Sequence, residues 1–266
     1  MQEIPANFQR LAAEDEVIYG TPAFIYLAPP DVDDPLCVKK KSDWIAWRGA
    51  PYEAERHSEY LYIPERDADK GPKILVSAVM PAPSNIEMYI QSISSKRRYD
   101  IQGKKATKLG YTADVICPAS RASEIWGIIH SCSSRQGRQI APLYLNRPPD
   151  HDFSSYKPYN NPHYDDICCG VFSPSGQLAA YLLGKRVGHH VQYDEIMGHA
   201  EHLHNDVMYL LHIKFLEICS QLPVPPRCLN YGPWYSGVNP FSKEGGLNRW
   251  KRKAKFKPAY LILASS

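Results

Sequence analysis

The sequence contains no apolar run close to the roughly 20 residues that a membrane-spanning helix requires, so we expect no membrane span. The first eight residues lack the basic stretch and apolar core of a secretory signal. The seven cysteines are an odd number at irregular spacing, which does not predict a disulfide framework. These three features together predict a cytoplasmic protein with reduced thiols.

Several catalytic motifs are also missing. The sequence has no Gly-x-Ser-x-Gly nucleophile elbow, no cysteine in a recognisable nucleophile motif, and no kinase or Walker phosphate loop. Zinc or iron would accept histidines such as the six that lie between His189 and His212. Their spacing nevertheless matches no closed zinc pattern, and the helical His-Glu-x-x-His motif is absent. We therefore expect no bound metal.

The composition is that of a globular protein, with 44% hydrophobic and 22% charged residues among 266. A net charge of +3 is nearly balanced and does not by itself indicate a nucleic-acid partner. Positive charge is, however, clustered at residues 96–98, 104–108 and 249–257. Such clusters bind phosphates of a nucleotide cofactor or of tRNA or DNA, or they form ordinary solvated surface.

Two regions differ in regularity along the chain. Residues 1–70 are broken by Pro29-Pro30 and a Lys39–Lys41 run, and only 23–27 and 44–47 resemble short strands or buried anchors. We therefore divide the chain into an irregular N-terminal subregion, residues 1–70, and a main domain, residues 71–266.

Hydrophobic periodicity in the main domain predicts an α/β (α+β) protein whose mixed, largely antiparallel central sheet is flanked by helices. The turn Ser173-Pro-Ser-Gly176 predicts a hairpin. Helix caps are expected at Ser84 with Glu87, at Ser120, and at Asn205 or Asp206. The expected strands are 74–79, 111–117, 167–172, 178–184, 190–197, 227–231 and 258–263, and the expected helices are 85–95, one after 120, and 203–221. A basic loop is expected after residue 95, and a proline- and tyrosine-rich loop of close to 20 residues ends at Tyr164.

Polar side chains gather where the strand 190–197 ends and the next helix begins, which is a common place for a ligand in an α/β sheet. Glu195 or His199 is a candidate base for an amine nucleophile, and Tyr231 and Tyr235 are candidate acids for the leaving group. A backbone amide at the strand end would hold the developing oxyanion. The alternative is that these tyrosines only line the rim of the core, since the chain has 18 of them.

The segment Gly246–Pro258 mixes aromatic and basic residues. Lys251 and Lys253 are therefore candidate contacts to a substrate phosphate or to nucleic acid. Alternatively, Leu247, Trp250 and Phe256 are buried and the lysines are solvated. The two interpretations do not exclude each other.

From about Gly110 to Leu263 the chain resembles the GNAT-type N-acyltransferases. The resemblance is greatest to the branch related to the peptidoglycan-bridge aminoacyl-transferases. It rests on the hairpin 167–184, the strand to Met197, the helix 207–219, the strand 228–231 and the ending Gly-Leu-x-x-Trp-Lys-x-Lys-x-x-Phe-x-Pro. The resemblance implies a transferase that moves an acyl or aminoacyl group from a CoA or tRNA donor onto an amine. It also implies that Arg135 and Arg138 contact the acceptor or a phosphate.

One segment departs from the pattern of this family. Acyl-CoA users carry a glycine-containing run before the long helix, where backbone amides cradle a pyrophosphate. Here the run is His202-Leu-His-Asn-Asp-Val207, so the candidate donor contacts are His202, His204, Asn205 and Asp206. The missing glycines favour aminoacyl-tRNA over acetyl-CoA. Two alternatives remain: a phage-type enzyme that modifies a DNA base on this fold, and a non-catalytic binding module.

Overall fold

The computed structural model describes residues 24–26, 74–94, 99–135, 138–153, 156, 164–187, 190–233 and 243–263. The chain forms two compact units, unit 1 (residues 1–80 and 230–266) and unit 2 (residues 81–229). The anchor predicted at 44–47 lies outside the described residues, and the boundary predicted at residue 70 stays a prediction. Within the described ranges, no helix is both long and apolar enough to cross a lipid bilayer.

Unit 2 contains four neighbouring strands in the order β8-β7-β6-β3, and each adjacent pair is antiparallel. The predicted hairpin is confirmed: its turn closes with a 2.8 Å bond from the Gly176 N–H to the Ser173 carbonyl. Gly176 has φ +81°, a backbone conformation that residues other than glycine rarely adopt. The strands are β3 (Thr112–Val115), β6 (Tyr164–Phe172), β7 (Leu178–Val187) and β8 (His190–Gly198).

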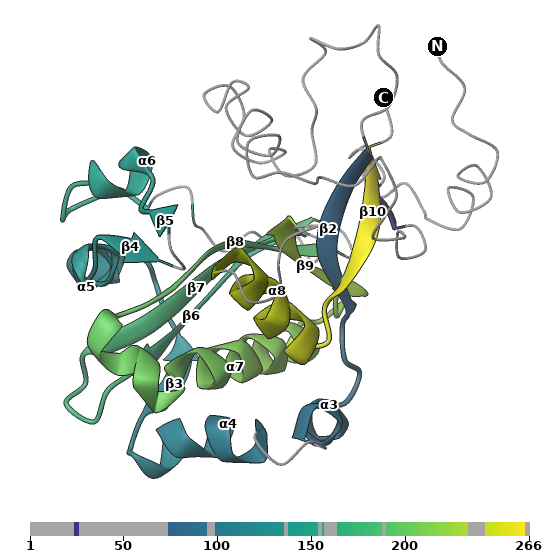
Figure 1. Ribbon diagram of the computed structural model, residues 1–266, viewed down its shortest axis with the longest axis horizontal. Helices are drawn as coiled ribbons and strands as arrows, with labels where there is room; N and C mark the ends of the chain where they lie inside the picture. The colour runs from purple at the N-terminus through teal and green to yellow at the C-terminus, as the bar shows by residue number, and fades with distance from the viewer. Residues whose placement is uncertain are drawn as a thin grey trace, which may run out of the picture. The chain divides into compact units, whose positions relative to one another are not determined.

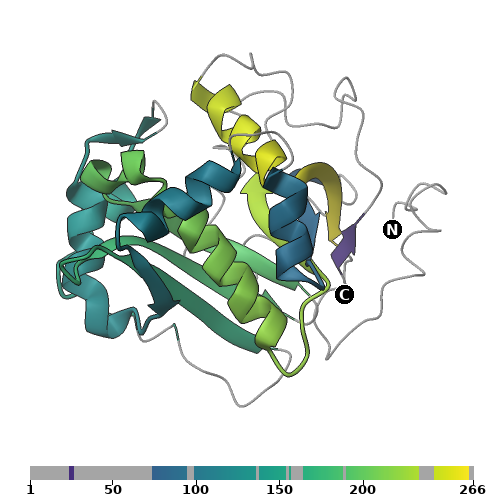
Figure 2. The same ribbon diagram turned by 90° about the horizontal axis from the view of Figure 1, so that it is seen from below.

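Helices cover both faces of these strands (Figure 1). One face carries α3 (Ile86–Ser94), α4 (Tyr99–Lys108) and α7 (Val207–Gln221), which pack on one another (Figure 2). The other face carries α5 (Ala122–His130) and α6 (Pro142–Leu145). This largely antiparallel sheet with flanking helices confirms the predicted fold class.

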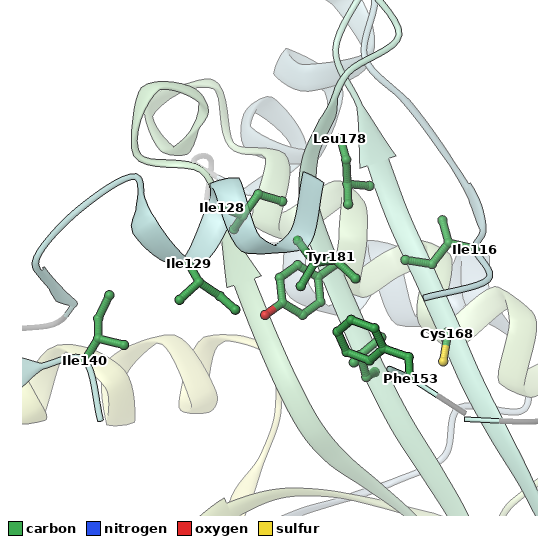
Figure 3. Close-up of a cluster of buried hydrophobic side chains, with 10 residues drawn as sticks. Ile116, Ile128, Ile129, Ile140, Phe153, Cys168, Leu178 and Tyr181 are labelled. Carbon is green, nitrogen blue, oxygen red and sulfur yellow. The ribbon is translucent and has the colours of Figure 1, made fainter. Parts of the chain in front are cut away.

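Side chains alternate between the two faces along β7, as expected for a buried strand. Tyr181 and Leu183 belong to the core beneath α5, whereas a Cβ at Gly184 would lie 2.5 Å from the Phe215 ring of α7. Tyr181 lies between Ile128 and Ile129 of α5 on one side and Phe153 on the other (Figure 3). Each of these isoleucines is fully buried and stabilises the fold by about 1.5–3 kcal/mol.

The described residues of unit 1 form strands in the order β1-β10-β2-β9 and the helix α8. The helix α8 (Lys243–Lys253) ends with a bond of 2.9 Å from the Phe256 N–H to the Lys251 carbonyl, and Lys255 there has φ +65°. Phe256 is buried, as one interpretation of this segment predicted. The strands are β1 (Phe24–Tyr26), β2 (Ile74–Pro81), β9 (Cys228–Pro233) and β10 (Lys257–Leu263).

Three helix caps differ from their predictions. The capping box of Ser84 and Glu87 is wrong, because Asn85 accepts the bond from the Met88 N–H, at 2.8 Å. Ser120 donates to the Cys117 carbonyl instead of capping α5. Asp206 holds the N-cap position of α7 without a side-chain cap bond.

Two helix boundaries also differ. The residues expected to form a basic loop after residue 95 include α4, whose Ala106 is fully buried. The long helix begins at Val207 and not at Leu203, because a separate 3₁₀ helix, η3 (Ala200–Asn205), precedes it. The end of β8, η3 and the start of α7 therefore follow one another directly, in the region where the sequence predicted a site.

Candidate functional site

Strand β8 carries a β-bulge in the middle of the candidate site. Leu183 pairs with Glu195 and Gly184 pairs with Tyr193, so Asp194 is the extra residue at which the register of the β7–β8 ladder shifts. The hydroxyl of Tyr193 contacts His212 of α7, while Asp194 and Glu195 accept bonds from Tyr156 and Tyr181 at the core beneath α5. The bulge interrupts the alternation of the strand and brings two consecutive carboxylates to the same face.

Glu195 is part of a buried ion pair. Its carboxylate accepts two bonds from the Arg147 guanidinium, at 2.6 and 3.0 Å, and a third from the Tyr181 hydroxyl at 3.1 Å. Both charged side chains are only 8% exposed. Burial would lower the pKa of Arg147, but the hydrogen bond and charge of Glu195 outweigh this and raise it. The predicted catalytic role of Glu195 stays a prediction, and it would require this pair to open.

Asp194, the neighbour of Glu195 in the bulge, makes a second contact with the segment that follows Arg147. It accepts a hydrogen bond from the Tyr156 hydroxyl, and the Lys185 ammonium lies 4.4 Å from the centre of the Tyr156 ring. Burial and then the charge of Asp194 raise the pKa of Tyr156 well above its usual value. The segment that contains Arg147 and Tyr156 is thus tied to β8 through both acidic residues of the bulge.

The end of β8 is clamped to α5. Arg135 donates to the Gly198 carbonyl at 2.6 Å and also to the Ile128 carbonyl, while the Ser131 hydroxyl accepts from the Ala200 N–H at 3.0 Å. The sequence suggested Arg135 as an acceptor or phosphate contact, but both of its terminal nitrogens donate to the protein. Its Nε is buried without a partner among the described residues.

A side chain at position 198 would require its neighbours to move. A Cβ there would lie 2.7 Å from the Met208 Sδ and 2.8 Å from a Leu203 methyl group. This close approach packs η3 and the first turn of α7 directly against the strand end.

Imidazole rings follow immediately. His199, the residue after β8, accepts a bond from the Glu201 N–H at its Nδ1, and its ring centre lies 5.4 Å from that of His202. The Nδ1 of His202 is 2.8 Å from the Tyr111 hydroxyl, which also accepts from the Asn205 amide at 2.9 Å. Burial and the neighbouring His199 lower the pKa of His202. The structure therefore brings together His199, His202 and Asn205 of the predicted set.

His204 and Asp206 complete the segment between β8 and α7. His204 is exposed, and its carbonyl accepts from the Lys105 ammonium of α4 at 2.5 Å. Asp206 has φ +62°, and its partial burial raises its pKa, an effect that Lys105 partly opposes. Backbone N–H groups of Ala200, Glu201 and His202 are all bonded within the protein. The amides of this segment are thus less available than those of a glycine-rich phosphate loop.

The remaining predicted site residues lie elsewhere in the chain. Tyr231, Lys251 and Lys253 belong to unit 1, Tyr235 lies outside the described residues, and Arg138 is in the short strand β5 (Arg138–Gln139). The Lys251 side chain is 1% exposed, and its ammonium lies 4.7 Å from the centre of the Tyr231 ring. Burial raises the pKa of Tyr231, which favours its protonated form.

A further histidine, His212, is fully engaged in the core of unit 2. Its two ring nitrogens bond the hydroxyls of Tyr89 and Tyr193, at 2.9 and 3.0 Å. Burial lowers the pKa of His212 to about 3, so the ring is neutral near pH 7. Across the described parts of the chain, no group of three or more His, Cys, Asp or Glu side chains is placed to hold a metal ion.

Sequence reasoning missed five residues that shape this site. Arg147, Tyr156 and Asp194 make the ion-pair and hydroxyl contacts of the bulge, and Tyr111 and Lys105 contact η3. Only the basic cluster containing Lys105 carried a signal in the sequence. The others lie 38 to 94 residues from their partners, so no local pattern could have linked them.

Comparison with known proteins gives a fold. No protein-family model matches the sequence, and no curated protein matches it either. The structure of FemX matches with a TM-score of 0.54 at 9% identity, over 71% of this chain and 61% of that one. L-PGS from Bacillus licheniformis matches with a TM-score of 0.45 at 13% identity, over 75% and 64%. A GCN5-related N-acetyltransferase from Kribbella flavida has a TM-score of 0.39 at 10% identity, over 76% and 65%.

This chain therefore spans less than two thirds of the length of each of these three proteins. The similarity to FemX concerns the fold, since the sequence identity is far too low to carry a function. The chain has a GNAT-like fold, as the sequence predicted.

Proposed function

We propose that this protein is a transferase that moves an acyl or aminoacyl group from an activated donor onto an amine. The observation that carries the proposal is the bulged strand β8, which ends at Gly198 in a segment of half-exposed polar side chains before α7. A strand end that opens onto a helix start is a favoured position for a ligand in α/β sheets. The fold shared with FemX is compatible with this chemistry.

The proposed reaction forms one amide and breaks one ester or thioester. The amine nitrogen attacks the acyl carbon, the C–N bond forms, and the carbonyl electron pair moves onto oxygen. The carbonyl then re-forms as the bond to the leaving oxygen or sulfur breaks. The nitrogen loses one proton and the leaving group gains one, so no oxidant, reductant or metal is needed.

Aminoacyl-tRNA is the donor we favour over acetyl-CoA. The segment from His199 to Asp206 contains no glycine, and several of its amides are bonded within the protein. A compact pyrophosphate cradle is therefore poorly supported at this position. Lys105 on α4 reaches the same segment, and Lys104 and Lys108 are exposed on that helix. These cations would suit the extended phosphate backbone of a tRNA.

Transfer can be tested directly with the purified full chain. Radiolabelled aminoacyl-tRNA and acyl-CoA pools are offered separately with a panel of amines, and amide products are identified by mass spectrometry. We expect one donor class to give product. The His199→Ala variant should be slower by about 100-fold or more, while His130→Gln on α5 serves as a matched control. Absence of amide product with every donor would reject the proposal.

A second candidate is an enzyme that modifies a DNA base. It is favoured by the exposed cations Arg249, Arg252, Lys253 and Lys255 around the end of α8. If it is correct, duplex DNA should bind with a steep salt dependence that weakens when Lys253 and Lys255 are neutralised. Lys251 is unsuitable for this test because it is buried. Binding that is absent or insensitive to salt would dismiss this candidate, and any turnover would exclude a purely non-catalytic binding module.

A further inference from the structure

The buried hydroxyl of Tyr111 determines which nitrogen of His202 carries the proton. Tyr111 is 6% exposed, and its hydroxyl contacts only the Asn205 amide nitrogen and the His202 Nδ1 within the described part of the chain. The Asn205 amide is a donor, so the hydroxyl proton has only the His202 nitrogen as an acceptor. A buried hydroxyl proton without an acceptor would be costly. Nδ1 of His202 therefore carries no hydrogen, and the ring hydrogen lies on Nε2.

The same assignment follows for His199 from a different contact. Its Nδ1 accepts a hydrogen bond from the backbone N–H of Glu201, at 3.4 Å, and so caps η3. A backbone N–H can only donate, so Nδ1 carries no hydrogen. In the neutral ring the hydrogen then lies on Nε2.

The two rings consequently present the same kind of group. Their centres are 5.4 Å apart, and neither Nε2 has a hydrogen-bond partner in the described ranges. Both rings are half-buried. The clamp of Arg135 and Ser131 fixes the main chain on either side of His199, so the rings are held by a rigid strand end.

The charges around the pair do not suit a group that carries two negative charges. Lys105 contributes a positive charge to this segment, whereas Glu201 and Asp206 contribute carboxylates. The local balance is therefore not strongly positive, as a phosphate dianion would require. Two neutral imidazole N–H groups suit an oxygen that gains charge only during a reaction.

We propose that the Nε2–H groups of His199 and His202 form a two-donor site for one oxyanion. This inference rests on the proposed function for its role, because that oxygen is the donor's acyl carbonyl oxygen as the amine attacks. The assignment also changes the chemistry expected of His199. With Nδ1 occupied and a hydrogen on Nε2, the ring donates a hydrogen bond and does not begin the reaction as a base.

The first experiment reads the tautomers without any substrate. The protein is labelled with ¹⁵N at histidine, and long-range ¹H–¹⁵N spectra are recorded near neutral pH. We expect His199 and His202 both to show the pattern of hydrogen on Nε2, assigned through His199→Gln and His202→Gln. Hydrogen on Nδ1 of either ring would overturn the proposal. In Tyr111→Phe, which removes the hydroxyl, His202 should become a mixture of tautomers.

The second experiment measures binding of dimethylphosphinate, a tetrahedral monoanion, against chloride at equal ionic strength. We expect the Nε2 resonances of both rings to shift together. His202→Gln keeps a donor close to the Nε2 position and should bind within about threefold of the parent protein, while His202→Asn should bind about tenfold or more weakly. His130→Gln is the control that should not change. Equal binding by the Gln and Asn variants, or shifts identical to those with chloride, would overturn the site.

These outcomes separate the site from the proposed transferase activity. Correct tautomers with dimethylphosphinate binding but no amide product would leave the oxyanion site standing and reject acyl transfer. Amide product together with a hydrogen on Nδ1 of His202 would support acyl transfer and reject the oxyanion site.

Discussion

Lowering the pH should destabilise this protein through His212, which lies fully buried between Tyr89 and Tyr193. Burial lowers the pKa of His212 from 6.5 to about 3 in the folded chain. In the unfolded chain the ring takes up a proton near pH 6.5. Its contribution to stability is therefore fully present above about pH 6.5, and it is lost progressively as the pH falls toward about 3.

The magnitude follows from the two pKa values. Between about pH 7 and pH 4.5 the folded ring stays neutral while the unfolded ring becomes protonated. At roughly 1.36 kcal/mol per pH unit, the free energy of unfolding should fall by about 2.5 kcal/mol over this interval through His212 alone. That is a substantial part of the 5–15 kcal/mol typical of a folded domain.

Urea unfolding at about pH 7 and pH 4.5, followed by tryptophan fluorescence, measures this loss. Carboxylates also contribute, so the informative quantity is the difference in pH dependence between the parent protein and His212→Gln, with the exposed His204→Gln as the control. We expect His212→Gln to lack about 2.5 kcal/mol of the pH dependence. If His212→Gln does not fold, the ¹⁵N chemical shifts of His212 in the parent protein are measured instead, and they should remain those of a neutral ring down to about pH 4. An unchanged pH dependence, or protonation of the folded ring near pH 6, would refute the reasoning.

Three further changes test the packing around the site by urea unfolding. Arg147→Met should lower the free energy of unfolding by about 3–5 kcal/mol, because it leaves the Glu195 carboxylate buried without its partner. Adding Glu195→Gln should restore at least half of that loss, and additive losses would contradict the pairing. Gly198→Ala should cost about 1 kcal/mol, since the flexible Met208 and Leu203 side chains must move away from the new Cβ, and a loss above about 3 kcal/mol would show that they cannot move. Lys255→Gly should stabilise unit 1 by about 1 kcal/mol because Lys255 has φ +65°, and a destabilised variant would argue against that conformation.

The sequence predicted those elements whose apolar residues follow a local period. The isoleucines of α5 recur at helical spacing, and all three are fully buried in the core. The turn at Ser173–Gly176 set the register of the hairpin. Cys168 and Cys169 point to opposite faces, as an extended strand requires: the former joins the core beneath α5 and the latter contacts the Leu211 carbonyl.

Other features depend on distant contacts and left no local pattern. Helix α4 is rich in lysine, and packing on α7, with Ala106 fully buried, stabilises a segment that its sequence alone does not mark as helical. The partners of the ion pair between Arg147 and Glu195 lie 48 residues apart. The position of the bulge is decided by pairing with β7, and a strand sequence cannot show which residue will be left out of the ladder.

The bulge also separates the chemistry of two residues that the sequence places four positions apart. Glu195 faces the core beneath α5 and forms a buried ion pair, whereas His199 follows the strand end and is half-buried. A loss of activity in Glu195→Gln would therefore be accompanied by a loss of stability, since it leaves the Arg147 guanidinium buried without its counter-charge. A loss of activity in His199→Gln should occur with little change in unfolding, because within the described part of the chain its ring makes only one long hydrogen bond. Measuring both properties on the same two variants distinguishes a residue that holds the site together from one that acts on the substrate.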